Sequence, residues 1–103
     1  MKKIIVGLVV FTCACTAATK VTKPSTELLP AMQQKVPGIT LARAEQGYTA
    51  YKQNCTECHR LHAASEYTTA QWDAILVKMF PKAKVHDEAT QGLITDYLHA
   101  LSK

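Results

Sequence analysis

Apolar side chains recur every three or four residues in three stretches of the chain, which is the period of an amphipathic α-helix. The first stretch covers residues 40–56, with apolar positions at Leu41, Ala44, Tyr48, Tyr51 and Cys55. In the second, they are Trp72, Ile75, Leu76, Met79 and Phe80. In the third, at the end of the chain, they are Leu93, Ile94, Tyr97, Leu98 and Leu101. No stretch alternates apolar and polar residues as a strand does, so the pattern predicts an all-α protein.

Residues suited to begin a helix precede each stretch. The hydroxyl of Thr40 is placed to accept a hydrogen bond from a free amide of the first turn. Thr68 and Gln71 have the spacing of a capping box, and Asp87 brings a carboxylate to the positive N-terminal end of the last helix. We expect Pro81 to end the second helix, because proline lacks the amide that continues the hydrogen-bond ladder.

Gly47 lies inside the first predicted helix, one turn before Tyr51 and on nearly the same face. A glycine at such a position lowers helix stability by about 1 kcal/mol relative to alanine. We therefore expect another backbone segment to approach Gly47 closely. The alternative is a tolerated glycine on the helix surface.

The first residues have the organisation of a secretory signal. Lys2 and Lys3 are followed by an apolar run over residues 4–11 and by small residues over 12–18. The run is far shorter than the roughly 18 residues of a spanning helix, so a transmembrane anchor is the weaker alternative. We expect residues 1–14 to be a signal peptide that exports the protein to the bacterial periplasm.

Cys15 follows Ala14 at the end of this segment, which resembles a bacterial lipoprotein cleavage site. A lipid on Cys15 would hold the mature protein at the membrane surface. Ordinary cleavage near Ala17 or Ala18 is the alternative.

Residues 15–38 contain prolines at Pro24, Pro30 and Pro37, and no helical or strand period continues through them. We expect this segment to be a tether between the lipid anchor and the folded part of the chain. The alternative for part of it is that Leu28, Leu29, Met32 and Val36 lie against the domain surface. The domain itself is then predicted to cover residues 39–103.

The charge balance excludes one class of partner. The chain has 12 basic and 8 acidic residues, and removal of Lys2 and Lys3 with the signal leaves 10 basic residues and a net charge of +2. The basic residues are scattered along the chain, so we expect no nucleic-acid partner.

Cys55, Cys58 and His59 form a C-x-x-C-H run at the end of the first helical stretch. This run is the attachment signal for a c-type haem, whose two vinyl groups react with the thiols while the histidine ligates the iron. One helical turn brings sulfurs at i and i+3 to the same side. We therefore expect one haem c, covalently attached through two thioethers, with His59 as the proximal ligand.

Two other kinds of site use the same residue types. A thioredoxin-like redox pair needs a preceding strand, whereas the residues before Cys55 predict a helix. A zinc site with His59 and His62 would usually take its second pair of ligands from a separate segment.

The sixth ligand of the iron must come from a methionine or histidine elsewhere in the chain. Met79 ends an apolar helical face and carries a soft sulfur, so we expect it to be that ligand, with ordinary core packing as the alternative. His86 is the second candidate. Met32, His62 and His99 are less favourable candidates for the sixth ligand. We expect Trp72 to pack on the porphyrin edge or a propionate, or else to be plain core.

Residues 39–103 resemble the small single-haem bacterial cytochromes c of the class I type. The resemblance rests on the C-x-x-C-H run, on Gly47 and Tyr51 before it, and on Ile94, Tyr97 and Leu98 near the end of the chain. The stretch from Trp72 to Met79 is similar to a Trp-led helix that delivers the Met ligand in short members. The resemblance implies a small cytochrome c-like helical domain, in which the first and last helices cross near the glycine and the aromatics and the haem lies beside them.

From these residues we expect a periplasmic carrier of single electrons and not an enzyme, because the chain offers no distal acid-base pair. Its partners would be membrane or periplasmic redox proteins, attracted by basic side chains around the haem edge. These side chains are Lys52, Arg60, Lys78, Lys82 and Lys84. The alternatives are a haem enzyme or gas-binding sensor with an open or displaceable sixth ligand, and a bis-His haem subunit of a larger redox complex.

Overall fold

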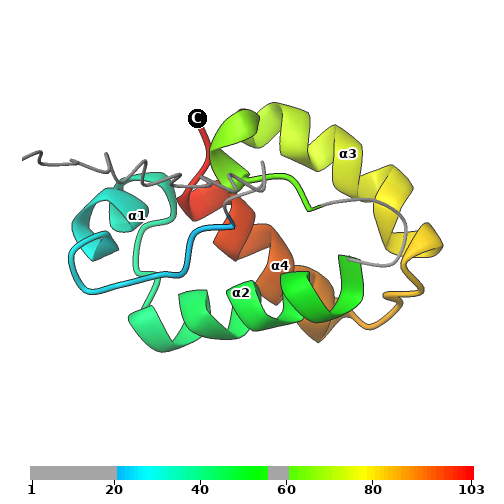
Figure 1. Cartoon of the computed structure of the whole chain (residues 1–103), viewed down its shortest axis with the longest axis horizontal. Helices are drawn as coiled ribbons and strands as arrows, with labels where there is room; N and C mark the ends of the chain where they lie inside the picture. The colour runs from blue at the N-terminus through cyan, green and yellow to red at the C-terminus, as the bar shows by residue number, and fades with distance from the viewer. Residues whose placement is uncertain (1–20, 56–60) are drawn as a thin grey trace, which may run out of the picture.

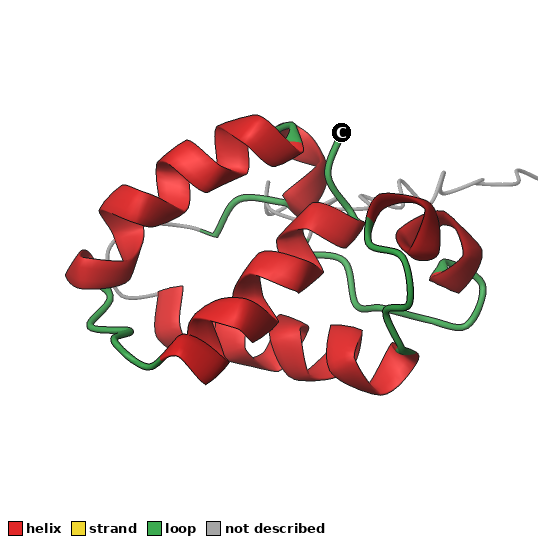
Figure 2. Cartoon of the chain, turned by 180° about the vertical axis from the view of Figure 1, so that it is seen from behind, coloured by secondary structure: helices red, strands yellow, loops and turns green. Residues whose placement is uncertain are grey.

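The computed structural model of the chain describes residues 21–55 and 61–103. Within these ranges every regular element is helical and no strand is present, which confirms the all-α prediction (Figures 1 and 2). The elements are α1 (Leu29–Lys35), α2 (Leu41–Cys55), a 3₁₀ turn (Ala64–Glu66), α3 (Thr69–Lys82) and α4 (Glu88–Ala100).

Helices α2 and α4 cross (Figure 1), and Gly47 of α2 lies where the backbone of α4 comes close. A methyl group at Gly47 would overlap the backbone carbonyl oxygen of Leu93 and come 2.5 Å from the Cβ of Tyr97. The expectation of a close backbone approach is therefore confirmed. The ring of Tyr97 lies 5.8 Å from that of Tyr48 and 5.9 Å from that of Tyr51, so aromatic packing continues the contact along α2.

The predicted caps are present at the start of α2, α3 and α4. The Thr40 hydroxyl accepts a hydrogen bond of 3.1 Å from the first turn of α2. Thr68 and Gln71 exchange the two bonds of a capping box, at 3.2 and 2.9 Å. The Asp87 carboxylate accepts a bond of 2.8 Å from the amide of Thr90. These short-range contacts fix where each helix begins.

The end of α3 differs slightly from the prediction, because the helix continues through Pro81 to Lys82. Pro81 lacks one amide donor, but the amide of Ala83 still donates a hydrogen bond of 2.8 Å to the Met79 carbonyl. The chain then turns at Lys84, whose φ of 60° is left-handed, and the Val85 amide reaches back to Phe80 at 2.9 Å. These bonds satisfy the last carbonyls in the manner of a Schellman motif.

The segment before residue 39 also differs from the prediction of a tether, because its described part contains helix α1 and packs into the core. Met32 of α1 is fully buried and packs in one cluster with Ile39, Ala44 and Ala100. Pro30 lies in the first turn of α1, where a missing amide costs no intrahelical bond. Pro24 and Pro37 therefore flank a short helix that contains Pro30 in its first turn, and residues 21–38 do not form an irregular tether.

The cap at Asp87 makes the stability of the fold depend on pH in the acid range. Hydrogen bonds from the side chain and backbone amide of Thr90 lower the pKa of Asp87 below its usual value of 3.8. Because the pKa is lowered, the charged cap stabilises the fold fully above the usual pKa of 3.8, and this stability is lost as the pH falls through the lowered pKa. Asp87→Asn keeps a good cap without a charge. We expect wild type to melt higher than the variant at pH 7, and the difference to shrink as the pH falls below about 4 and to vanish below the lowered pKa. An unchanged difference in melting temperature at pH 3 would contradict this.

Candidate functional site

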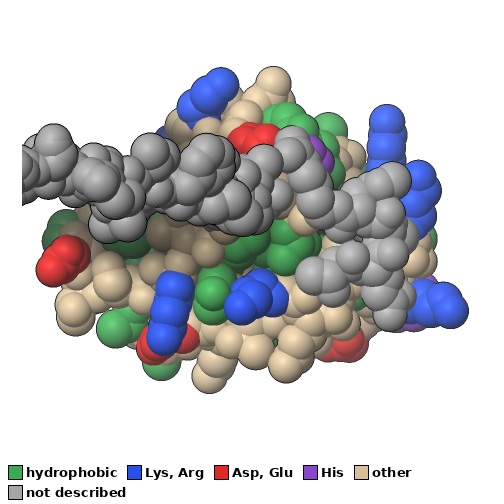
Figure 3. All heavy atoms as spheres, in the orientation of Figure 1, with side chains coloured by type: hydrophobic (Ala, Val, Ile, Leu, Met, Phe, Trp, Pro, Cys, Tyr) green, Lys and Arg blue, Asp and Glu red, His purple; other side chains and the backbone are tan. Residues whose placement is uncertain are grey.

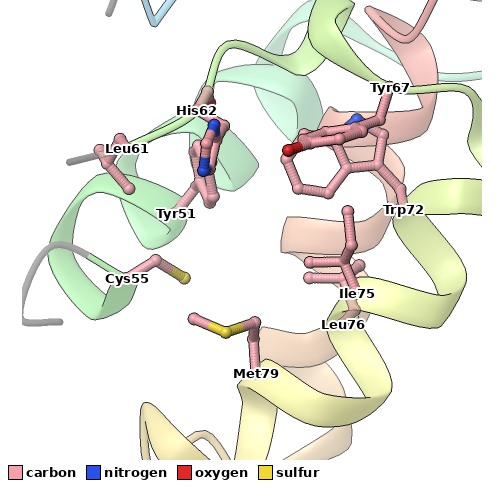
Figure 4. A pocket seen from close by; sticks show the side chains of 9 residues that line it. All are labelled: Tyr51, Cys55, Leu61, His62, Tyr67, Trp72, Ile75, Leu76 and Met79. Carbon is pink, nitrogen blue, oxygen red and sulfur yellow. The ribbon is translucent and has the colours of Figure 1, made fainter. Parts of the chain in front are cut away.

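A pocket of about 160 Å³ lies between the C-terminal end of α2, the connection before α3, and α3 itself (Figure 4). Its walls are mostly apolar and aromatic. The lining residues are Tyr51, Cys55, Leu61, His62, Tyr67, Trp72, Ile75, Leu76 and Met79.

The structure brings three of the five expected site residues to this pocket. Cys55 is the last residue of α2, and its thiol points into the pocket (Figure 4). Met79 comes from the last turns of α3, and its thioether extends toward the same space (Figure 4). Trp72, two turns earlier on α3, forms part of the opposite wall. Cys58 and His59 lie outside the described residues.

Trp72 is fixed by the 3₁₀ turn. Its side chain is 2% exposed, and its indole N–H donates a hydrogen bond of 2.8 Å to the carbonyl of Ala64. The ring meets Tyr67 and Tyr51 edge to face, at centroid distances of 5.1 and 6.2 Å. Because its polar atom is already bonded, Trp72 offers the pocket only carbon surface.

Tyr51 closes the inner end of the pocket as a neutral side chain. Its hydroxyl donates a hydrogen bond of 2.7 Å to the carbonyl of His62. Burial, followed by the charge that Cys55 carries when ionised, raises the pKa of Tyr51 far above its ordinary value of 10. Tyr51 therefore stays protonated at any physiological pH. Its hydrogen bond holds the backbone at His62, shortly after residues 56–60 in the sequence.

The histidines are placed differently from one another. His62 lines the pocket, with its Nδ1 3.2 Å from a Glu66 oxygen and its ring 5.5 Å from Tyr67. His86 is exposed on the connection between α3 and α4 and does not line the pocket. His99 pairs with Asp73 at 2.6 Å. Of the candidate sixth ligands, the structure therefore brings Met79 and His62 to the pocket.

Tyr67 is a wall residue that sequence reasoning did not assign to the site, and His62 lines the pocket although it was a less favourable candidate for the sixth ligand. Both lie in the irregular stretch between α2 and α3, where no periodicity indicates which side chains face inward. A signal existed for Tyr67, because it precedes the capping box and packs on Trp72 as a hydrophobic staple does.

The described part of the chain, residues 21–55 and 61–103, contains no group of three or more His, Cys, Asp or Glu side chains that could hold a metal ion. The zinc alternative depends on Cys58 and His59, so it falls outside these ranges. Among the same residues, no helix has both the length and the apolar character needed to cross a bilayer.

Comparison of the chain with models of known protein families, with curated proteins and with solved structures found no match.

Proposed function

We propose that this protein is a periplasmic c-type cytochrome that transfers single electrons between redox proteins. One haem would be attached through Cys55 and Cys58, and its iron would be held by His59 and Met79. The observation that carries the proposal is that the thiol of Cys55 and the thioether of Met79, from two different helices, face one apolar pocket (Figure 4).

The described residues fit a haem in three respects. Aromatic and aliphatic walls suit a flat, largely apolar macrocycle. The thiol at the end of α2 supplies the first attachment point, and the thioether across the pocket supplies a soft donor for iron. Cys55 and Leu61, the described residues on either side of positions 56–60, both line the pocket, so the stretch that contains Cys58 and His59 begins and ends beside it.

A haem bound here would supply an iron that accepts and releases one electron. Met79 would keep the sixth position filled, while Trp72, Tyr67 and Ile75 would exclude water. A thioether ligand and a dry pocket favour the reduced form, so the potential should exceed that of a bis-His site.

A basic surface near the end of α3 supports a role in protein-to-protein transfer. Lys78, Lys82 and Lys84 are exposed, and Figure 3 shows Lys and Arg side chains gathered at the end of the molecule where α3 leads into α4. Charges of one sign on one surface steer an oppositely charged partner. We place the acidic redox partner at this end. In the same proposal, the lipid on Cys15 keeps the carrier at the membrane.

Met79→Ala tests the proposed ligand pair in protein produced together with the cytochrome c maturation machinery. The oxidised wild type should show the weak far-red sulfur-to-iron band of His/Met coordination, and Met79→Ala should lose it. Met32→Leu is the matched control, because it removes the other described methionine sulfur at similar volume and should keep the band.

Covalent attachment is measured on the same samples, because attached haem remains with the chain after denaturation. We expect Cys55→Ala to lower the fraction of haem that remains with the chain. A band that survives Met79→Ala would reject Met79 as ligand. If the wild type lacks the band, the site is bis-His or five-coordinate, and binding of carbon monoxide to the reduced protein separates those two.

A further inference from the structure

The chain is already part of the folded domain at Val21. The hydroxyl of Tyr97, a residue with no exposed surface, donates a hydrogen bond of 2.6 Å to the carbonyl of Thr22. Val21 packs against the core cluster that contains Tyr97, and Pro24 is buried. We call residues 21–28 the N-terminal strap.

The strap is fixed at its other end by α1. Met32 of α1 is buried in one cluster with Ala44, near the start of α2, and Ala100, at the end of α4. The Leu28 amide bonds to the Ser25 carbonyl at 3.1 Å, and this turn leads directly into α1. The strap is therefore tied at both ends and cannot extend without breaking core contacts.

This leaves very little chain between Cys15 and the domain. Only residues 16–20 separate Cys15 from Val21, and a fully extended chain spans about 22 Å over those six steps. A tether that ran to residue 38 would instead reach about 86 Å. The folded strap thus shortens the reach of an anchor on Cys15 about fourfold.

We propose that the lipid-anchored protein lies on the bilayer with its N-terminal strap toward the phospholipid surface. The inference rests on the lipid at Cys15, which belongs to the proposed function. The short connection holds the strap near the head groups, and the rest of the domain lies beyond it.

The strap is suited to lie on the membrane and not in it. Its exposed side chains are polar, at Thr22, Lys23, Thr26 and Glu27. Among the described residues, the large apolar side chain left exposed is Val77 on α3, outside the strap. Contact with the head groups is therefore polar, and the membrane affinity comes from the covalent lipid.

The orientation also places the proposed haem pocket near the membrane. The ring of Tyr97, which binds the strap, lies 5.9 Å from the ring of Tyr51, which lines the pocket. A carrier on so short a tether does not sweep a wide volume. Electron exchange with its redox partner would take place at the membrane surface.

Energy transfer to the lipid surface tests the proposal on the mature, haem-loaded protein in vesicles with acceptor dyes on their head groups. With Cys15 lipidated and Cys55 and Cys58 attached to haem, an added cysteine is the single reactive thiol. Lys23→Cys places a far-red donor on the strap. Glu88→Cys places it at the start of α4, nine residues and about 14 Å along the helix from Tyr97. We expect more transfer from the strap than from the start of α4.

A second variant carries a 20-residue Gly/Ser insertion after Lys20. Flexible-chain scaling increases the mean separation of Cys15 and the strap about twofold if residues 16–20 are the whole tether. If the chain is free to residue 38, the same insertion increases the mean separation of Cys15 and the helical domain only about 1.4-fold. The donor at Glu88 lies in that domain in both cases, so a marked loss of its transfer supports the short tether and a near-constant signal overturns it.

Two controls separate this inference from the proposed function. Intact mass of the mature protein reports the lipid, and an unlipidated N-terminus overturns the membrane orientation while leaving the electron carrier in place. Equal transfer from both donors in a lipidated protein overturns it as well. Absence of the His/Met spectrum rejects the proposed ligands without affecting the transfer measurement.

Discussion

Gly47→Ala is expected to be one of the most destabilising single substitutions in the described part of the chain. The added methyl group would overlap the Leu93 carbonyl oxygen and crowd the Cβ of Tyr97. Both are fixed parts of α4, so α2 and α4 must separate along their contact. Overpacking typically costs 1–3 kcal/mol, and we expect about 3 kcal/mol here because backbone atoms cannot rotate away. That loss is a large fraction of the stability of a small domain.

Gly92→Ala is the matched control, since it adds the same methyl group to a glycine inside α4. The new methyl group would meet the end of the Arg43 side chain at 3.3 Å, and a flexible side chain can shift. Replacing a helical glycine by alanine favours the helix by about 1 kcal/mol. Urea unfolding of both variants should therefore give changes of opposite sign. Equal changes would mean that the Gly47 contact does not limit the approach of the helices.

The three longer helices were open to prediction from sequence, because each of them carries its own signals. The apolar period identifies the buried face, and local side-chain bonds such as those of Thr68 and Asp87 identify the first residue. The glycine in α2 even indicated where another helix would approach. These signals depend on neighbours within a few positions, which a single sequence displays directly.

Helix α1 was missed because its stability comes from tertiary contacts. It has seven residues, too few to be stable alone, and its apolar positions cover barely two turns. What holds it is the burial of Met32 against Ala44 and Ala100, which lie far away in the sequence. The same reason explains the site. Cys55, Trp72 and Met79 were predictable from helical faces, whereas His62 and Tyr67 reach the pocket from an irregular connection.

Met32→Ala should cost about 2–5 kcal/mol, the range found when large buried side chains are truncated to alanine. Met32 has no exposed surface, and its cluster joins α1 to α2 and α4. The backbones of α2 and α4 are held by their own contact at Gly47, so they cannot close over the cavity. The expected loss should appear in urea unfolding as a lower midpoint with a similar slope.

Val77→Ala is the control for loss of apolar side-chain atoms, since Val77 is 75% exposed and its truncation should change stability by less than about 0.5 kcal/mol. The far-red band expected from Met79 should survive in folded Met32→Ala, because the two methionines lie in different clusters. A Met32→Ala variant as stable as wild type would mean that α1 adds nothing to the fold. The strap would then be held only by its contacts at Val21, Thr22 and Pro24 with the core.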